Sequence, residues 1–174
     1  MPVTPADEND LRVIAAQLGR EPRGVVGVAW RCPCGRPGVV ATEPRLPDGS
    51  PFPTTFYLSC QRAVTEVSRL EASGLMTQLT QRLADDAELA ERYRQAHAAY
   101  IAARDQLGRV PELADVSAGG MPDRVKCLHA LVGHALAAGR GVNPVGDEAL
   151  DLIGDFWTRP CGAEGAAGDP GQGQ

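Results

Sequence analysis

The sequence predicts an α+β fold in which a small antiparallel sheet of about three strands is covered by several α-helices. Short β-branched runs bounded by glycine and proline occupy the first third of the chain, and such runs are typical of strands. Longer segments follow in which apolar residues recur every three or four positions, and this spacing forms one face of a helix. With 174 residues and a hydrophobic fraction of 43%, the chain has the size and composition of one domain with a core.

The first third of the chain is expected to form one helix and three strands. Residues 6–18 place Leu11, Ile14 and Leu18 at helical spacing, and Gly19 suits the end of this helix. A turn at Cys-Pro-Cys-Gly separates the first two strands, and an Asp-Gly turn precedes the third. The expected strands are residues 25–30, 39–42 and 54–58.

The rest of the globular part is expected to be helical. Ser59 is a suitable N-cap for the first of these helices, and Ser73-Gly74 is a suitable stop. Asp85 with Glu88 has the form of a capping arrangement ahead of a longer helix. Pro122 suits the first position of the next helix, because its missing N–H would be unpaired there in any case. The expected helices span residues 59–72, 75–83, 85–107, 122–138 and 147–156.

Composition limits the cellular setting and the classes of partner. Residues 1–158 are expected to form a single globular domain, whereas residues 159–174, rich in Gly, Ala, Pro and Gln, are expected to be a disordered tail. A formal net charge of -5 argues against general nucleic-acid binding. No window approaches the roughly 18 apolar residues of a membrane span. The odd number of five cysteines favours reduced thiols in a cytoplasm over a disulfide framework.

Residues 117–148 hold the densest set of chemically reactive side chains, including two of the three histidines and the only lysine. If a helix begins at Pro122, the N–H groups after the two preceding glycines and two nearby cationic side chains form a site for phosphate or carboxylate. Asp123 opposes an anion there and favours a cation or a salt bridge. The expected partner is therefore a small anionic ligand. The residues of this anion site are Gly119, Gly120, Arg124 and Lys126.

Cysteine and histidine side chains also indicate a metal site, because thiolate and imidazole are ligands that suit zinc. On a regular helix, Cys127 and His129 point roughly 160° apart. Only one of the two is therefore expected to join cysteines from the strand region, unless the first helical turn is irregular. The candidate zinc ligands are Cys32, Cys34, Cys60, Cys127 and His129.

A reactive thiol is the third hypothesis. Cys60 follows Ser59 at the expected start of a helix, where the helix dipole and Arg62 would favour a thiolate. His129 or His134 would serve as the partner base if the fold brings one of them close. The alternative is that Cys60 is a buried structural residue. The candidate catalytic residues are Cys60, His129 and Asp123.

Five strings in the chain are long and specific. They are Cys-Pro-Cys-Gly at 32–35, Leu-Pro-Asp-Gly-Ser-Pro-Phe-Pro-Thr at 46–54, Ser-Arg-Leu-Glu at 68–71, Gly-Gly-Met-Pro-Asp-Arg-Val-Lys-Cys-Leu-His at 119–129, and Gly-Val-Asn-Pro-Val-Gly-Asp at 141–147. Together they resemble the bacterial family known as domain of unknown function 501, over about residues 10–150. The resemblance implies a cytoplasmic bacterial protein, and it brings no catalytic residues.

Three functions are ranked from these observations. The first is a cytoplasmic protein that binds a metal ion (zinc), an anion, or both, at a polar Cys/His site. The second is a thiol-dependent or metal-assisted hydrolase. The third is a non-enzymatic adaptor, which would carry a broad exposed apolar patch and no pocket.

Overall fold

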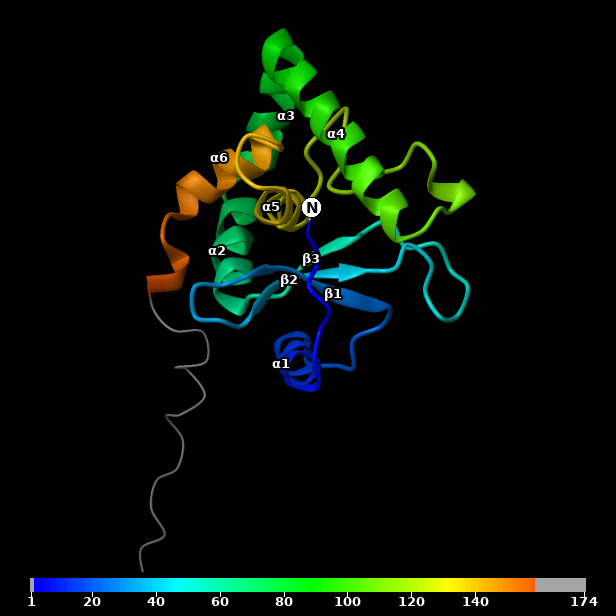
Figure 1. The fold of residues 1–174 in the computed structure, drawn as a ribbon. Coiled ribbons are helices and arrows are strands. Elements are labelled where there is room, and N and C mark those ends of the chain that lie inside the picture. The colour runs from blue at the N-terminus through cyan, green and yellow to red at the C-terminus, as the bar shows by residue number, and fades with distance from the viewer. Residues whose placement is uncertain (1, 159–174) are drawn as a thin grey trace, which may run out of the picture.

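The computed structural model describes residues 2–158 and confirms the expected α+β class. The elements are α1 (Glu8–Leu18), β1 (Val25–Arg31), β2 (Pro37–Thr42), β3 (Phe56–Leu58), α2 (Gln61–Ala72), α3 (Leu75–Asp85), α4 (Ala87–Leu107), η1 (Pro111–Leu113), α5 (Leu128–Ala138), α6 (Pro144–Ile153) and η2 (Phe156–Thr158). The sheet lies between α1 on one face and α5 on the other (Figure 1). The remaining helices pack around α5, so the core lies mainly between the sheet and the helical side.

The sheet is antiparallel throughout, in the order β1-β2-β3. In the central strand, Val40 pairs with Val28 of β1 and with Tyr57 of β3. Every residue of β2 is buried, as expected for a strand covered on both faces. The outer edge of β1 is bridged by Thr4 near the N-terminus.

α1 is fastened to the sheet by a buried carboxylate. Asp7 caps the helix by accepting from the N–H of Asp10 at 2.7 Å. The side chain of Asp10 accepts two hydrogen bonds from Arg31 of β1, at 2.8 and 2.6 Å. The Arg31 guanidinium holds the pKa of Asp10 below its usual range. This pair therefore fixes α1 over the sheet at neutral pH.

α5 occupies the centre of the fold because two glycines allow close packing on either side of it. A Cβ at Gly133 of α5 would lie 2.7 Å from the carbonyl oxygen of Phe56 in β3. A Cβ at Gly146 of α6 would lie 2.3 Å from the carbonyl oxygen of Leu131 in α5. Real side chains do not tolerate such distances. α5 is consequently held in one place relative to β3 and α6.

The expected helix over residues 122–138 is wrong at its start, because α5 begins only at Leu128. The preceding residues form a turn in which the Met121-Pro122 peptide is cis. The N–H of Val125 donates to Oγ1 of Thr80 at 3.0 Å, and other N–H groups of the turn donate to the two glycine carbonyls. In a helix that began at Pro122, the N–H groups of Val125 and Lys126 would bond to the carbonyls four residues earlier. Their bonds to Thr80 and Gly119 exclude that helix.

Two capping predictions and the start of the last helix are corrected as well. Cys60, and not Ser59, is the N-cap residue of α2, and it makes no side-chain capping bond. Asp86, and not Asp85, caps α4 by accepting from the N–H of Leu89 at 2.9 Å. Asn143 caps α6, which therefore starts earlier than the expected residue 147. The expected strands and the other helices are found close to their predicted positions.

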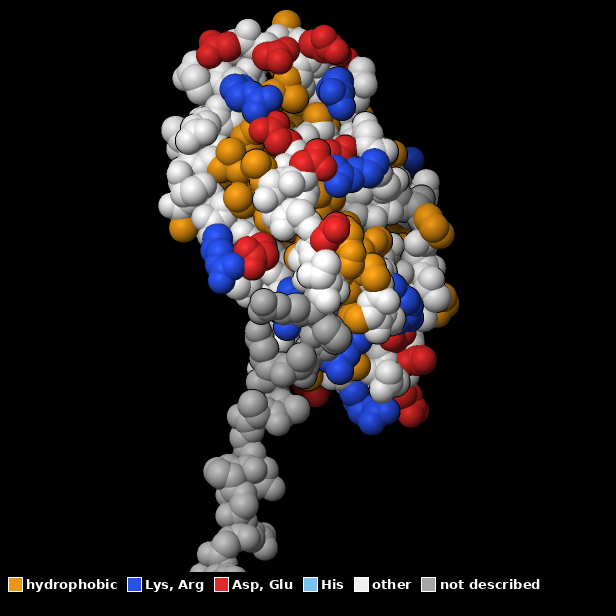
Figure 2. Space-filling model, turned by 90° about the vertical axis from the view of Figure 1, so that its left-hand side faces the viewer, with side chains coloured by type: hydrophobic (Ala, Val, Ile, Leu, Met, Phe, Trp, Pro, Cys, Tyr) orange, Lys and Arg blue, Asp and Glu red, His pale blue; other side chains and the backbone are white. Residues whose placement is uncertain are grey.

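Charged side chains of both signs are interspersed with hydrophobic ones on the side of the molecule that carries α2 and α6 (Figure 2). One such pair, Arg82 and Glu148 at 2.6 Å, joins α3 to α6. Within residues 2–158, no helix combines the length and the apolar character that a membrane crossing requires. The expected disordered tail, with Cys161, lies outside the described residues.

Candidate functional site

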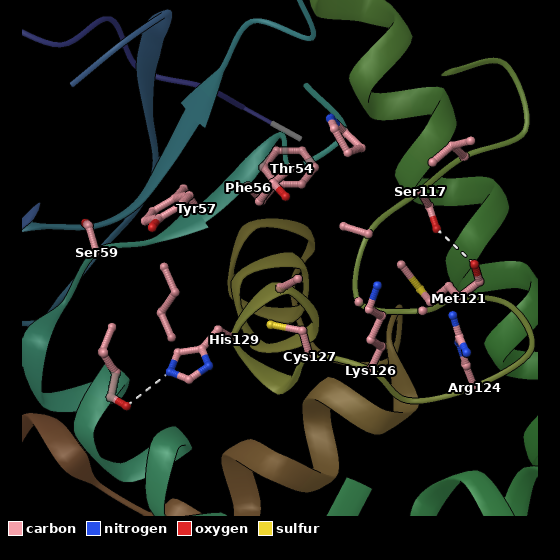
Figure 3. Close-up of a pocket in the computed structure, with 18 of the residues that line it drawn as sticks. Thr54, Phe56, Tyr57, Ser59, Ser117, Met121, Arg124, Lys126, Cys127 and His129 are labelled. Carbon is pink, nitrogen blue, oxygen red and sulfur yellow. Dashed lines mark hydrogen bonds between the residues drawn. The ribbon is translucent and has the colours of Figure 1, made fainter. Parts of the chain in front are cut away.

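A cleft of about 1230 Å³ opens beside the first turn of α5. Its walls come from β3 and the residues before it, from the first turns of α2 and α5, and from residues 115–127. Figure 3 shows Tyr57 on the β3 side and Met121 on the opposite side, with Cys127 and His129 on the wall between them. A cleft of this size accommodates a small organic molecule.

The segment 115–127 is anchored to α4. Arg104 of α4 is fully buried, forms an ion pair with Asp105 at 2.9 Å and donates a hydrogen bond to the carbonyl of Val116. Farther along, the hydroxyl of Tyr93 donates to the carbonyl of Arg124 at 3.2 Å. These contacts hold one wall of the cleft in a fixed position, although the segment has no regular secondary structure.

Two consecutive glycines shape the same segment. Gly119 and Gly120 have φ values of 72° and 94°, in the left-handed region that favours glycine. A Cβ at Gly120 would lie 2.6 Å from the carbonyl oxygen of Arg124. The carbonyl of Gly119 accepts from the N–H of Lys126 at 2.7 Å. The tight turn therefore delivers Lys126 and the next residue, Cys127, to the wall of the cleft.

Glu71, Cys127 and His129 come together at this wall. Glu71 lies in the last turn of α2, Cys127 is the N-cap residue of α5, and His129 lies in the first turn of α5. Each residue offers one ligand atom, namely a carboxylate oxygen, a thiol sulfur and an imidazole nitrogen. These three atoms lie within 4.8 Å of one another. Within residues 2–158, this is the only group of three or more such side chains that is so close.

The two nitrogens of His129 both face hydrogen-bond acceptors. Nδ1 lies 3.1 Å from a carboxylate oxygen of Glu71. Nε2 lies 3.2 Å from the carbonyl oxygen of Val64 and 3.2 Å from Oγ of Ser68. A hydrogen bond with Cys127, reinforced by the charge of Glu71, outweighs the effect of burial and raises the pKa of His129 to about 9. The imidazole is therefore held in one orientation and is protonated at neutral pH in the absence of a metal ion.

Glu71 is the residue of this group that the sequence analysis missed. Its carboxylate also accepts the N–H of Leu128 at 2.7 Å, which places negative charge at the positive end of α5. In its own helix, α2, the same carboxylate lies at the unfavourable negative end. An acidic residue in the last turn of a predicted helix was thus a weak signal that its partner lies elsewhere in the fold.

Cys127 and His129 meet because Cys127 is not helical. Its φ and ψ values of -152° and 110° are extended, so the expected angle of roughly 160° between the two side chains on a regular helix does not apply. The sequence left open the possibility that the first turn is irregular, and in the structure Cys127 is an extended residue ahead of the helix. In Figure 3 the sulfur of Cys127 points toward His129.

The other cysteines predicted as ligands do not join this group. Cys32 is buried at the end of β1, and Cys34 is exposed in the turn after it. Cys60 is 0% exposed and does not line the cleft. The thiol that a ligand in the cleft would meet is therefore that of Cys127.

The residues predicted as an anion site all line the cleft, but without a helix start at Pro122. Arg124 and Lys126 are exposed on the wall formed by residues 115–127. Asp123, predicted as a catalytic candidate, is exposed on the same wall.

His134 belongs to the core and not to the cleft. It is 0% exposed and packs against the rings of Phe56 and Tyr100, with ring centroids 5.9 and 5.0 Å away. Its Nδ1 lies 3.1 Å from the side-chain nitrogen of Asn143. Burial lowers the pKa of His134 to about 4, so the ring is neutral at physiological pH.

Comparison with known proteins gives one match. The family model described as a protein of unknown function (DUF501) matches residues 28–151, which is more than half of the chain and includes all three residues of the Glu71–Cys127–His129 group. No curated protein and no solved structure matches the chain.

Proposed function

We propose that this chain, which belongs to the DUF501 family, binds a zinc ion through Glu71, Cys127 and His129. The observation that carries the proposal is the approach of three different ligand atoms to within 4.8 Å of one another. Two of the three residues, Cys127 and His129, also line the cleft. A zinc ion held by these side chains would leave a coordination position for a molecule in the cleft.

The donor set favours zinc over the hard cations. Zinc accepts sulfur, imidazole nitrogen and carboxylate oxygen in a tetrahedral arrangement, whereas calcium and magnesium take oxygen ligands almost exclusively. Three protein ligands with one open position are typical of catalytic zinc sites, and four protein ligands are typical of structural ones. The three side chains therefore support a zinc centre with an open position, at which a ligand would bind or react.

The surroundings of the ligands support the same proposal. A metal-binding histidine usually donates its second N–H to a carbonyl or carboxylate. The Val64 carbonyl lies 3.2 Å from Nε2 of His129, which leaves Nδ1 for the metal. The carboxylate of Glu71 is oriented by the N–H of Leu128. Both ligands are thus held in place by the packing of α2 against α5.

Elemental analysis of the purified protein after zinc loading tests the proposal. We expect about one zinc ion per chain in the wild type, and a loss of zinc affinity in Cys127→Ala and Glu71→Gln. Cys34→Ala is the matched control, since Cys34 is outside the group, and it should keep its zinc. Retention of zinc by Cys127→Ala, with loss in Cys34→Ala or Cys60→Ala, would refute this site in favour of the other cysteines.

A second function, thiol-dependent hydrolysis, is favoured by one observation. Cys127 is hydrogen-bonded to His129, whose pKa is raised to about 9, and a cysteine beside a protonated histidine is the arrangement that stabilises a thiolate nucleophile. Zinc would bind the same sulfur, that of Cys127, so the rate of alkylation of Cys127 with and without zinc distinguishes the two functions. If zinc-free wild type and protein incubated with zinc are alkylated by iodoacetamide at Cys127 at equal rates, the metal proposal loses its support and the thiol proposal takes its place. The cleft supports either function over that of an adaptor.

A further inference from the structure

Lys126 is the only lysine of the chain, and the fold places it beside the proposed metal centre. Its backbone N–H is bonded to Gly119, and a Cβ at Gly120 would lie 2.8 Å from the Cβ of Lys126. The absence of a side chain at Gly120 is therefore what allows Lys126 to occupy this position. Figure 3 shows Lys126 next to Cys127 on the wall of the cleft.

The positive charges on this wall have no internal partner. Among residues 2–158, neither the ammonium of Lys126 nor the guanidinium of Arg124 forms an ion pair, although many other arginines of the chain do so. Two carboxylates, those of Asp115 and Asp123, line the same wall. The unpaired positive charge is therefore local to Arg124 and Lys126, on the segment that leads directly into Cys127.

The opposite wall is largely apolar. Pro53 and Tyr57 are partly exposed on it, and Phe56 and Leu58, which also contribute to it, are buried. Figure 3 shows Tyr57 across the cleft from Lys126. A volume of about 1230 Å³ is much larger than an inorganic oxyanion, so a small ion alone would leave this apolar wall in contact with water.

We infer that the cleft takes an elongated organic anion with a phosphate or carboxylate head and an apolar, ring-containing body. The head lies beside Lys126 at the open position of the metal, and the body packs against Tyr57 and its neighbours. This inference rests on the proposed zinc centre, and it names the class of ligand that the centre serves. An ammonium and a metal ion together bind a single oxyanion more strongly than either does alone.

Calorimetric titration of the zinc-loaded full chain tests the inference, with phenyl phosphate as the probe. Phenyl phosphate should bind about tenfold more tightly than inorganic phosphate, because the ring buries apolar surface. Lys126→Gln should weaken phenyl phosphate binding by about tenfold or more, because it removes a charge-assisted hydrogen bond. A parallel titration with benzoate distinguishes a carboxylate head from a phosphate head.

Two control variants isolate the charge of Lys126 from other effects. Lys126→Arg keeps the charge and should keep most of the affinity. Arg12→Gln removes an exposed positive charge on α1, outside the cleft, and should bind as the wild type does. Equal affinity of Lys126→Gln and wild type, or equal affinity for phenyl phosphate and inorganic phosphate, overturns the inference.

The zinc content of every sample separates the two proposals. Lack of zinc in the wild type after loading refutes the metal centre. A zinc-loaded wild type that fails to bind phenyl phosphate and benzoate refutes the organic-anion ligand alone. Loss of zinc from Lys126→Gln together with loss of phenyl phosphate binding overturns the assignment of Lys126 to the anion, because Lys126 is not one of the three ligands.

Discussion

Lowering the pH from 7 to 4 is expected to destabilise the folded protein by about 3 kcal/mol through one residue, His134. The imidazole is 0% exposed, and burial lowers its pKa from the model-peptide value of 6.5 to about 4. Each unit of difference between the folded and unfolded pKa corresponds to roughly 1.4 kcal/mol. The neighbours Phe56, Tyr100 and Asn143 carry no charge that would stabilise an imidazolium.

The direction of this effect follows from proton uptake. Below about pH 6.5 the unfolded chain takes up a proton at His134, whereas the folded protein does so only below about pH 4. Protonation therefore favours the unfolded state throughout this interval. The stability that depends on the neutral imidazole is complete above pH 6.5 and is lost as the pH falls toward 4.

Urea unfolding of the wild type and of His134→Gln at pH 7.0, 5.5 and 4.5 measures the effect. Other groups also titrate in this range, so the relevant quantity is the difference between the two proteins at each pH. The wild type should lose about 2.4 kcal/mol more than the variant between pH 7.0 and pH 4.5. An NMR titration of His134 in the folded wild type gives its pKa directly. A value near 6.5, or equal losses in both proteins, would refute the burial argument.

Two further substitutions test the packing that positions the cleft. Gly146→Ala brings a Cβ within 2.3 Å of the Leu131 carbonyl oxygen and should lower the free energy of unfolding by about 1–3 kcal/mol in urea titrations; an unchanged value would show that α5 and α6 pack less closely. Arg104→Leu removes the bond to Val116 and should speed amide hydrogen exchange over residues 115–118, whereas Arg94→Leu, at an exposed ion pair, should not; equal exchange in the two variants would contradict the anchoring of this wall.

The order and type of most elements could be predicted because they depend on local patterns. Residues 25–30 are a β-branched run bounded by turn signals and lie in β1, and the three-four spacing after residue 59 corresponds to α2, α3 and α4. The start of α5 could not be predicted, because it is decided by a contact between Val125 and Thr80. These residues are 45 positions apart, and a capping rule considers only near neighbours in the chain.

The candidate site could be predicted in part for the same reason. Cys127 and His129 were identified by their residue types, but their partner Glu71 is brought in by the packing of α2 on α5, and 57 positions separate it from Leu128, to which it is bonded. Cys60 was expected near a helix start and is found there, but tertiary packing buries it completely. Burial of this kind depends on which helix covers which face, and periodicity alone does not specify that.

Zinc K-edge X-ray absorption of the zinc-loaded full chain tests the central claim most directly. Binding through Glu71, Cys127 and His129 predicts one sulfur at about 2.3 Å and the remaining nitrogen or oxygen ligands at about 2.0–2.2 Å. In Glu71→Gln, zinc affinity should fall while the single sulfur ligand remains in any zinc that is still bound. A shell of three or four sulfurs, or a spectrum without any sulfur, would contradict the proposed centre.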